Sequence, residues 1–240
     1  MKIIKVKDFA ELSLEATKIV SELIKNNPQA TLGLATGSSP VGLYQNLVKM
    51  YQNKEISFKG IKTYNLDEYC ELPKSHSQSY YSFMYQNLFS HVDIADKNIH
   101  IPSSEDQDMQ KNCDDYNDLL KATTIDLQLL GIGGNGHIGF NEPGTPFDKE
   151  TFLVKLAERT RQDNKKFFGE DEEVPHFAIT MGIKNIMEAK KILMLISGSG
   201  KAEAVKRLLS GEITTDFPAS ILHKHPDVTL IIDEAAASLI

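Results

Sequence analysis

Short apolar runs alternate along this chain with longer stretches in which apolar residues recur every three or four positions. The short runs predict strands, and the periodic stretches predict amphipathic helices. The predicted strands cover 3–6, 31–36, 61–66, 125–132, 176–181, 192–197 and 228–233. The predicted helices cover about 8–26, 40–53, 77–90, 108–122, 200–210 and 234–240. This alternation indicates an α/β fold with a doubly wound, mostly parallel sheet and helices on both faces.

The length of 240 residues allows one α/β domain or two small ones. The one shift in composition lies at 144–175, which is polar, has a weak apolar pattern and contains an acidic run at 170–173. Because strands of the same kind continue after it, we expect a lid rather than a linker. The sequence therefore predicts a single domain, 1–240, with a lid at about 144–175.

The charge and cysteine content narrow the possible partners. A net charge of -7 argues against a nucleic-acid or acidic-membrane surface, which usually carries clustered Lys and Arg. The two cysteines, Cys70 and Cys113, suit a reducing compartment better than a disulfide scaffold. Residues 1–7 lack the apolar core of a signal peptide, and no apolar run approaches the ~20 residues that would span a membrane. We expect a cytoplasmic protein with no nucleic-acid or membrane partner.

The sequence Thr-Gly-Ser-Ser-Pro at 36–40 follows one predicted strand and opens a predicted helix. Ser39 suits the N-cap and Pro40 the first helical position. Such a junction directs free backbone N–H groups and the positive end of a helix dipole at one spot, and Gly37 allows a close approach. The segment predicts either a phosphate-binding turn or an ordinary capped turn.

Asp67 and Glu68 come just after the apolar run 61–66. Open α/β sheets bind ligands at the carboxyl ends of their strands, and a carboxylate beside a sugar there can take a proton from carbon. Two interpretations stay open. Asp67 is a general base, or Asp67 caps the next segment while Glu68 is an exposed surface charge.

A glycine-rich loop, GIGGNGHIGFNEP, occupies 131–143 directly after an apolar run. It contains G-x-G-x-x-G, which is typical of dinucleotide sites. Gly139 and the Pro-Gly pair that follows exclude the helix which that motif normally opens, so we expect no dinucleotide cofactor. The glycines instead bring His137 and Glu142 toward one ligand. A histidine there can move protons on a sugar oxygen, and a carboxylate can fix its tautomer or raise its basicity.

The sequence Ser-Gly-Ser-Gly-Lys at 197–201 follows another apolar run. It departs from a P-loop because Leu195 occupies the place of the first glycine and Ala202 replaces the magnesium-binding Ser or Thr. Lys201 at a helix start suits a phosphate, although a solvated lysine fits equally. The His-Lys-His segment at 223–225 has no third ligand at suitable spacing, so we expect loop surface and no metal site.

Five sequence blocks, taken in order, resemble the glucosamine-6-phosphate deaminase family: GLATGSSP at 33–40, NLDEY at 65–69, SYYSFM at 79–84, GHIGFNEP at 136–143 and TRQDN at 160–164. The resemblance extends from the first predicted strand to residue 233. It implies an enzyme of amino-sugar catabolism that needs no metal or cofactor. The implied reaction isomerises and deaminates glucosamine 6-phosphate to fructose 6-phosphate and ammonia.

The resemblance also implies roles for particular residues. His137 would assist opening of the sugar ring, with Glu142 and Asn135 supporting it. Asp67 would move a proton from C2 to C1, giving an enolamine and then an imine that water hydrolyses. The segment 144–175 would close over the substrate. The implied phosphate-binding residues are Thr36, Gly37, Ser38, Ser39, Lys166 and Lys201.

The chain departs from the family pattern at several positions. Asn135 stands where many relatives have Asp; an amide cannot relay charge, although it can orient the His137 ring through a hydrogen bond. Lys166 stands where relatives often have Arg. An arginine can bind a phosphate through two parallel hydrogen bonds, whereas a lysine offers a single point charge. Residues 152–154 are Phe, Leu and Val where allosteric relatives have basic residues, and the sequence stops at residue 240, so we expect no C-terminal extension like theirs. We expect no amino-sugar effector site and a monomer or small homo-oligomer.

Two other functions remain as alternatives. One is a 6-phosphogluconolactonase, whose family shares this architecture and a Gly-His loop; Glu142 argues against it, because ester hydrolysis does not require that additional carboxylate. The other is a non-catalytic sugar-phosphate sensor. Transcription regulators of that kind carry a DNA-binding helix-turn-helix, for which this chain leaves no segment.

Overall fold

The computed structural model describes residues 1–103, 108–165, 168–169 and 172–240. Its main sheet has seven strands in the order β1-β10-β9-β6-β2-β3-β5, and all neighbouring pairs are parallel. The strands are β1 (Lys2–Val6), β2 (Thr31–Leu34), β3 (Lys62–Asn65), β5 (Ile99–His100), β6 (Leu127–Leu130), β9 (Ile192–Ile196) and β10 (Val228–Asp233). The prediction of a doubly wound α/β fold is confirmed.

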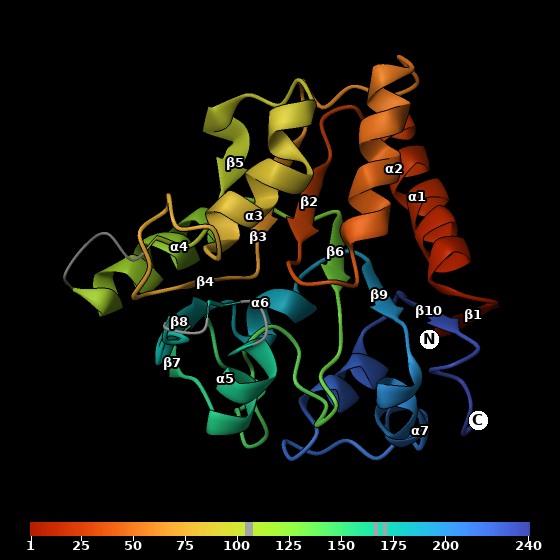
Figure 1. Cartoon of the computed structure of the whole chain (residues 1–240), viewed down its shortest axis with the longest axis vertical. Coiled ribbons are helices and arrows are strands. Elements are labelled where there is room, and N and C mark those ends of the chain that lie inside the picture. The colour runs from red at the N-terminus through yellow and green to blue at the C-terminus, as the bar shows by residue number, and fades with distance from the viewer. Residues whose placement is uncertain (104–107, 166–167, 170–171) are drawn as a thin grey trace.

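The helices are α1 (Phe9–Asn26), α2 (Val41–Gln52), α3 (Tyr80–Asn87), α4 (Met109–Lys121), α5 (Glu158–Lys165), α6 (Ile183–Met187) and α7 (Ala202–Leu209). Short 3₁₀ helices cover Phe89–His91, Asp96–Asn98, Ser199–Lys201 and Pro218–Lys224. Figure 1 shows α1 and α2 side by side along the sheet. No helix in the described part of the chain combines the length and apolar character needed to cross a bilayer.

The helix predicted at 234–240 is wrong, because these residues form turns. The Asp233 carboxylate accepts the N–H of Ala236 at 2.8 Å, and the Asp233 carbonyl accepts that of Ala237. These two bonds form one capped turn, which the following residues do not continue into a regular helix.

The core forms where the sequence pattern places apolar side chains on both faces of the sheet. All five residues of β9 are buried, so its continuous apolar run contacts helices on either side. Helix α1 packs one stripe against the sheet, while its Asp8 N-cap accepts the N–H of Glu11 at 3.0 Å. The stripe consists of Leu12, Ala16, Val20 and Ile24.

A second, antiparallel sheet has the order β4-β8-β7, formed by β4 (Asp67–Tyr69), β8 (Phe177–Thr180) and β7 (Phe152–Lys155). The predicted strand 176–181 therefore exists, but it does not join the parallel sheet. Its Thr180 lies opposite both Asp67 and Phe152. The sheet has its own apolar cluster of Tyr69, Phe140, Val154, Leu156, Phe168, Val174 and Ala178. The segment 144–175, whose apolar pattern is weak and which we expect to be a lid, contains the strand β7 and the helix α5.

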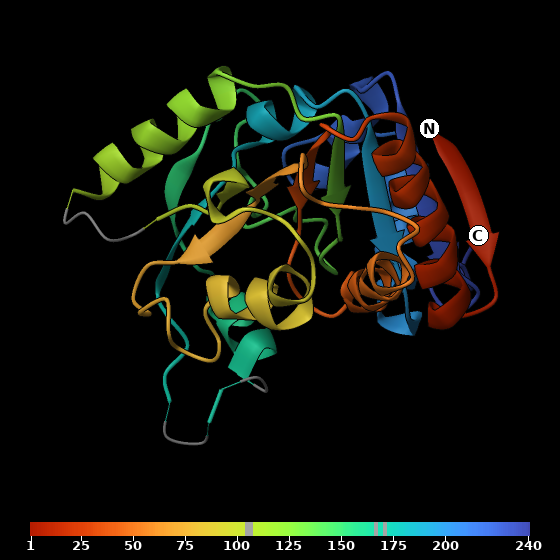
Figure 2. The ribbon, with the colours of Figure 1, turned by 90° about the horizontal axis from the view of Figure 1, so that it is seen from above.

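The strand order changes direction between β2 and β6. After β2 the chain builds β3 and β5 on one side, then returns to β6 on the other. Ligands of open α/β sheets bind beyond the carboxyl ends of the strands at such a switch point. In Figure 1 the strands β2, β6 and β9 point to one end of the sheet, beyond which α5 and α7 lie. Figure 2 shows both termini at the far edge, where β1 pairs with β10.

Candidate active site

A cavity of about 330 Å³ opens at the carboxyl ends of β2 and β6. Small-molecule sites typically begin at about this size. The cavity brings together seven of the predicted site residues: Thr36, Gly37, Ser38, Ser39, Asp67, His137 and Lys201. Asn135 and Glu142 belong to the same loop as His137 and contact that residue, and Lys166 lies outside the described residues.

The loop after β2 supplies one wall of this cavity. Gly37 has a φ of +87°, a backbone conformation that favours glycine. Helix α2 begins at Val41, and the N-cap position is Pro40, with no side-chain capping bond. The expected placement of Ser39 at the N-cap is therefore wrong by one residue. Its hydroxyl does not cap α2 and instead lines the cavity, where it can donate to an anion.

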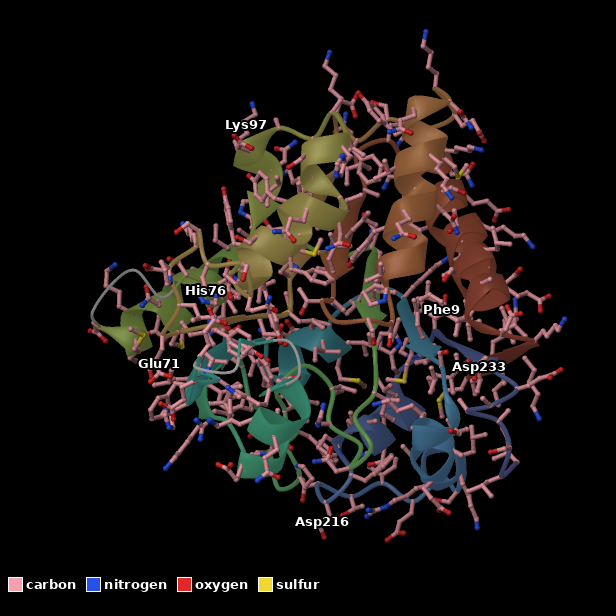
Figure 3. The ribbon with its side chains drawn as sticks, viewed as in Figure 1. Phe9, Glu71, His76, Lys97, Asp216 and Asp233 are labelled. Carbon is pink, nitrogen blue, oxygen red and sulfur yellow. The ribbon has the colours of Figure 1, made fainter. Side chains whose placement is uncertain are left out.

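Lys201 reaches the cavity from the loop between β9 and α7. Gly198, at a φ of +93°, turns this loop, and its N–H donates to both carboxylate oxygens of Asp233 at 3.1 Å. The Ser197 hydroxyl donates to the same carboxylate. Asp233 ends β10 (Figure 3), so the last strand of the sheet fixes the loop that presents Lys201. The sequence pattern alone does not indicate this role of Asp233.

Asp67 is the first residue of β4, and only 6% of its surface is exposed. Among the described residues no hydrogen-bond donor reaches its carboxylate, which lines the cavity. Burial, together with the neighbouring Glu68 carboxylate, raises the pKa of Asp67 to about 8. A carboxylate of this basicity suits the removal of a proton from carbon near neutral pH.

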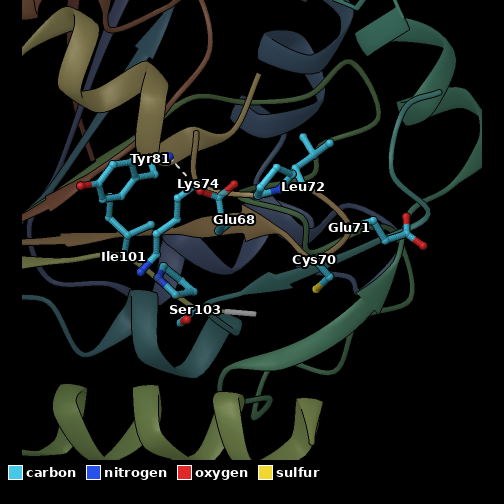
Figure 4. A pocket seen from close by; sticks show the side chains of 10 residues that line it. Glu68, Cys70, Glu71, Leu72, Lys74, Tyr81, Ile101 and Ser103 are labelled. Carbon is cyan, nitrogen blue, oxygen red and sulfur yellow. Dashed lines mark hydrogen bonds between the residues drawn. The ribbon is translucent and has the colours of Figure 1, made fainter. Parts of the chain in front are cut away.

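Glu68 points away from Asp67 into the body of the protein. Its carboxylate accepts the backbone N–H groups of Tyr69, Tyr80 and Tyr81 at 2.8–2.9 Å. Figure 4 shows Glu68 beside Tyr81 in a second pocket, which Cys70, Leu72 and Lys74 also line. Burial raises the pKa of Glu68, and the three N–H groups oppose that shift. The interpretation of Glu68 as an exposed surface charge is wrong, because it holds the first turn of α3 against β4.

The glycines of the loop after β6 make room for His137. A Cβ on Gly133 would lie 2.3 Å from the His137 ring, and one on Gly136 would lie 2.2 Å from the Phe217 ring. Gly136 has a φ of +86°. A Cβ on Gly139 would approach the Asp67 carboxylate to 3.4 Å. The contacts at 133 and 136 explain why the loop needs glycine there, and all three show that its backbone passes close to both the imidazole and the carboxylate.

Glu142 lies behind the His137 ring. Its Oε2 atom is 3.7 Å from Nδ1 of His137, an ion-pair distance rather than a hydrogen bond. The same oxygen accepts from Nδ2 of Asn135 at 2.9 Å, and the other oxygen accepts from the Thr160 hydroxyl. The Oδ1 atom of Asn135 accepts the backbone N–H of His137 at 3.2 Å. Asn135 therefore bonds the backbone of His137 and acts on its ring through Glu142, whereas we had expected a direct bond.

Sequence reasoning missed several residues that line the cavity, among them Tyr80, Phe140, Thr160 and Asn164. Tyr80 is in α3, and burial raises its pKa well above the ordinary value. Asn164 is in α5 and donates to the Tyr69 hydroxyl at 3.2 Å. The signal was present, because three of the four lie in the blocks at 79–84 and 160–164 that carried the family resemblance.

The two histidines at 223 and 225 do not form a metal site. Nε2 of His223 lies 2.7 Å from the Leu208 carbonyl, and Nε2 of His225 lies 2.7 Å from the Ala189 carbonyl. His225 is buried, which corrects the expectation of loop surface. Across the described ranges no cluster of three or more His, Cys, Asp or Glu side chains could hold a metal ion.

The cavity thus combines two kinds of chemistry. Hydroxyls, a glycine turn and Lys201 at one end suit an anion such as a phosphate. At the other end lie the buried Asp67 carboxylate, with its raised pKa, and the His137 imidazole, which Glu142 faces. These two groups can take and return protons. Such a site can move a proton between carbons of an anionic substrate.

Comparison with known proteins agrees with this chemistry. A family model described as glucosamine-6-phosphate isomerases/6-phosphogluconolactonase matches residues 7–231. The chain belongs to this family. The matched region contains all the described residues that line the cavity.

Relatives within the glucosamine-6-phosphate isomerase/6-phosphogluconolactonase family resemble the chain over its full length. A glucosamine-6-phosphate deaminase of Clostridium novyi is 53% identical over 239 residues, which cover 99% of each chain. One from Thermoanaerobacter pseudethanolicus is 50% identical and covers all of this chain and 95% of its own. The solved structure of a monomeric glucosamine-6-phosphate deaminase is 47% identical, with a TM-score of 0.98 and full coverage of both chains.

The fold alone extends to more distant solved structures. The 6-phosphogluconolactonase from Trypanosoma brucei has a TM-score of 0.80 at 19% identity, and covers 99% of this chain and 97% of its own. Because identity at that level shows only shared architecture, it does not extend lactonase chemistry to this chain.

Proposed function

We propose that the chain is a glucosamine-6-phosphate deaminase. It would convert D-glucosamine 6-phosphate and water to D-fructose 6-phosphate and ammonia, as a step of amino-sugar catabolism. The observation that carries the proposal is the placement of Asp67 and His137 in one cavity with the anion-binding loop and Lys201. Relatives that bear this name at about half identity and nearly full coverage support it.

We propose that the phosphate of the substrate binds at the end of the cavity nearest α2. The backbone N–H groups and hydroxyls of 36–39 would donate to its oxygens, and Lys201 would neutralise part of its charge. Lys166, which lies outside the described residues, is proposed as a second cation for the same phosphate. This anchoring would hold the sugar carbons between Asp67 and His137.

Ring opening would depend on His137, which moves a proton between the ring oxygen and the C1 hydroxyl. Glu142 faces Nδ1 of the same ring, so its charge would stabilise the imidazolium formed during that transfer. Asn135 would keep the Glu142 carboxylate in place. The product of this step is the open-chain aldehyde with its amine on C2.

Isomerisation would then depend on Asp67. Its carboxylate takes the proton from C2, which gives an enolamine, and returns the proton to C1, which gives the imine of fructose 6-phosphate. Water adds to C2 of the imine, and the C–N bond breaks to release ammonia and leave the ketone. The raised pKa of Asp67, about 8, supports this role because the carboxylate is a stronger base than one in water.

The remaining features of the proposal concern context. We propose a cytoplasmic, single-domain enzyme that acts without metal or cofactor, with the segment 144–175 covering bound substrate. The likeness to a monomeric deaminase supports a monomer rather than a larger assembly. Light scattering of the purified chain tests the oligomeric state.

The decisive experiment is product analysis from glucosamine 6-phosphate with no metal or nucleotide added. We expect ammonia and fructose 6-phosphate in equal amounts. Hydrolysis of 6-phosphogluconolactone without any release of ammonia would make the chain a lactonase. Binding of glucosamine 6-phosphate without turnover would make it a sensor.

A further inference from the structure

Thr160 joins α5 to the loop that carries His137. It is 6% exposed, and its hydroxyl donates to Oε1 of Glu142, 18 positions earlier in the chain. The contact links a helix of the segment 144–175 directly to the carboxylate behind the imidazole. A buried threonine hydroxyl with a carboxylate partner makes a charge-assisted bond, which is stronger than a bond between neutral groups.

The two oxygens of Glu142 have separate partners. Oε2 accepts from Asn135 and faces His137, while Oε1 accepts from Thr160. The last torsion of a glutamate side chain is soft, so a carboxylate held through one oxygen alone can rotate. Donors on both oxygens remove that freedom, and Oε2 stays directed at the ring.

We propose that Thr160 is a positioning residue for the proposed deamination, and that its hydroxyl keeps the Glu142 carboxylate aligned with His137. The inference rests on the proposed function of His137. Thr160 does not act on the substrate itself in this account; it acts through Glu142.

Other contacts of α5 show what a merely structural role would look like. Asn164 binds the Tyr69 hydroxyl, and Arg161 donates to the Val174 carbonyl at 3.0–3.1 Å. These bonds hold α5 in place without touching Glu142. If Thr160 only fastened α5, its loss would loosen the helix and weaken substrate binding but leave the chemical step unchanged.

The chain offers a matched control for the test. The hydroxyl of Thr145 also bonds Glu142, but it donates to the backbone carbonyl at 2.7 Å and not to the carboxylate. Thr160→Val and Thr145→Val each remove one threonine hydroxyl that donates to Glu142. Thr160→Val removes the donor to its carboxylate, and Thr145→Val removes the donor to its backbone carbonyl. Thr160→Ser keeps the donor and should restore most of the lost activity.

The experiment measures kcat and KM for ammonia release from glucosamine 6-phosphate in the full-length parent and the three variants. For Thr160→Val we expect kcat to fall about 10- to 100-fold, because misplacement of a catalytic group by roughly an ångström costs about that much. We expect KM to change less than threefold, and Thr145→Val to keep kcat within about threefold of the parent. A loss confined to KM, an equal loss in Thr145→Val, or no recovery in Thr160→Ser would overturn the proposal.

A crystal structure of Thr160→Val separates this inference from the proposed function. We expect the Glu142 carboxylate to be turned away from Nδ1 of His137, with α5 still folded. An unchanged Glu142 would refute the positioning role whether or not the parent has activity. A parent without ammonia release would refute the proposed function, and the position of Glu142 would still decide the role of Thr160.

Discussion

Replacing Asp67 by Asn should stabilise the fold while it removes activity. The carboxylate is 6% exposed, and its ordinary pKa of 3.8 is raised to about 8 by burial and by Glu68. Ionised Asp67 is therefore costly to the folded state. Asn has nearly the same shape and carries no charge, so the substitution removes that cost without opening a cavity.

The sign and size of the effect follow from the two pKa values. The pKa of Asp67 is higher in the folded chain than in the unfolded chain, so the folded state binds more protons between pH 4 and 8. The associated stability is fully present below about pH 4, falls as pH rises, and is lost above about pH 8. One pKa unit corresponds to about 1.4 kcal/mol, so the three pH units from 5 to 8 amount to about 4 kcal/mol. The stability advantage of Asp67→Asn over the parent should grow by about that amount over this range.

Urea unfolding of the parent and of Asp67→Asn at several pH values between 5 and 9 measures the difference. Asp216→Asn, which removes an exposed carboxylate, is the control and should follow the parent at every pH. Ammonia release by Asp67→Asn should fall by about 10²- to 10⁴-fold, as expected for the loss of a general base. A stability difference that does not grow with pH, or activity within about threefold of the parent, would refute the role given to Asp67.

Three further predictions follow from the site. The value of kcat/KM should rise with pH until Asp67 is ionised near pH 8. Glu68→Gln should move that rise to lower pH, because the Glu68 charge raises the pKa of Asp67. The ionisable groups of the substrate are the same for both proteins, so they cannot account for the difference. Gly136→Ala should lower the free energy of unfolding, measured in urea, by about 2 kcal/mol or more, because its methyl would lie 2.2 Å from a buried phenylalanine ring. Gly144→Ala has open space around the new methyl and should lower the free energy of unfolding by only about 1 kcal/mol. Lys201→Met should raise KM for glucosamine 6-phosphate about 10- to 100-fold in a steady-state assay of ammonia release, because a hydrogen bond to a charged group typically contributes about 1.5–3 kcal/mol.

Six of the seven strands described in the main sheet could be predicted from the sequence, and the inner ones are clearest because they are buried on both faces; the two-residue strand β5 (Ile99–His100) is too short to leave such a pattern and was not predicted. The run Ile192–Ile196 is apolar throughout, and any register of such a run still gives a buried strand. By contrast β4 consists of Asp67, Glu68 and Tyr69, and only its pairing with β8 makes it a strand. Tertiary pairing of this kind leaves no trace in local periodicity.

The candidate site could be assembled in part for the same reason. Residues that follow apolar strands gather at one edge of a parallel sheet, so the loops near 37, 67 and 137 could be expected to meet. The partners that support them come from elsewhere in the chain. Thr160 and Asp233 reach the site from a small helix and from the end of the last strand, and no spacing rule relates them to the loops that they hold.

The position of β10 has a consequence for how the protein is made. This strand lies between β1 and β9, so residues 2–6 gain their pairing partner only when residues 228–233 have been synthesised. Asp233, at the end of the same strand, then restrains the loop that carries Lys201. A growing polypeptide can therefore build the middle of the sheet early, but it acquires a completed anion pocket only after residue 233 has been synthesised. Such late, long-range closure predicts slow final folding, with apolar surface exposed until the strand pairs.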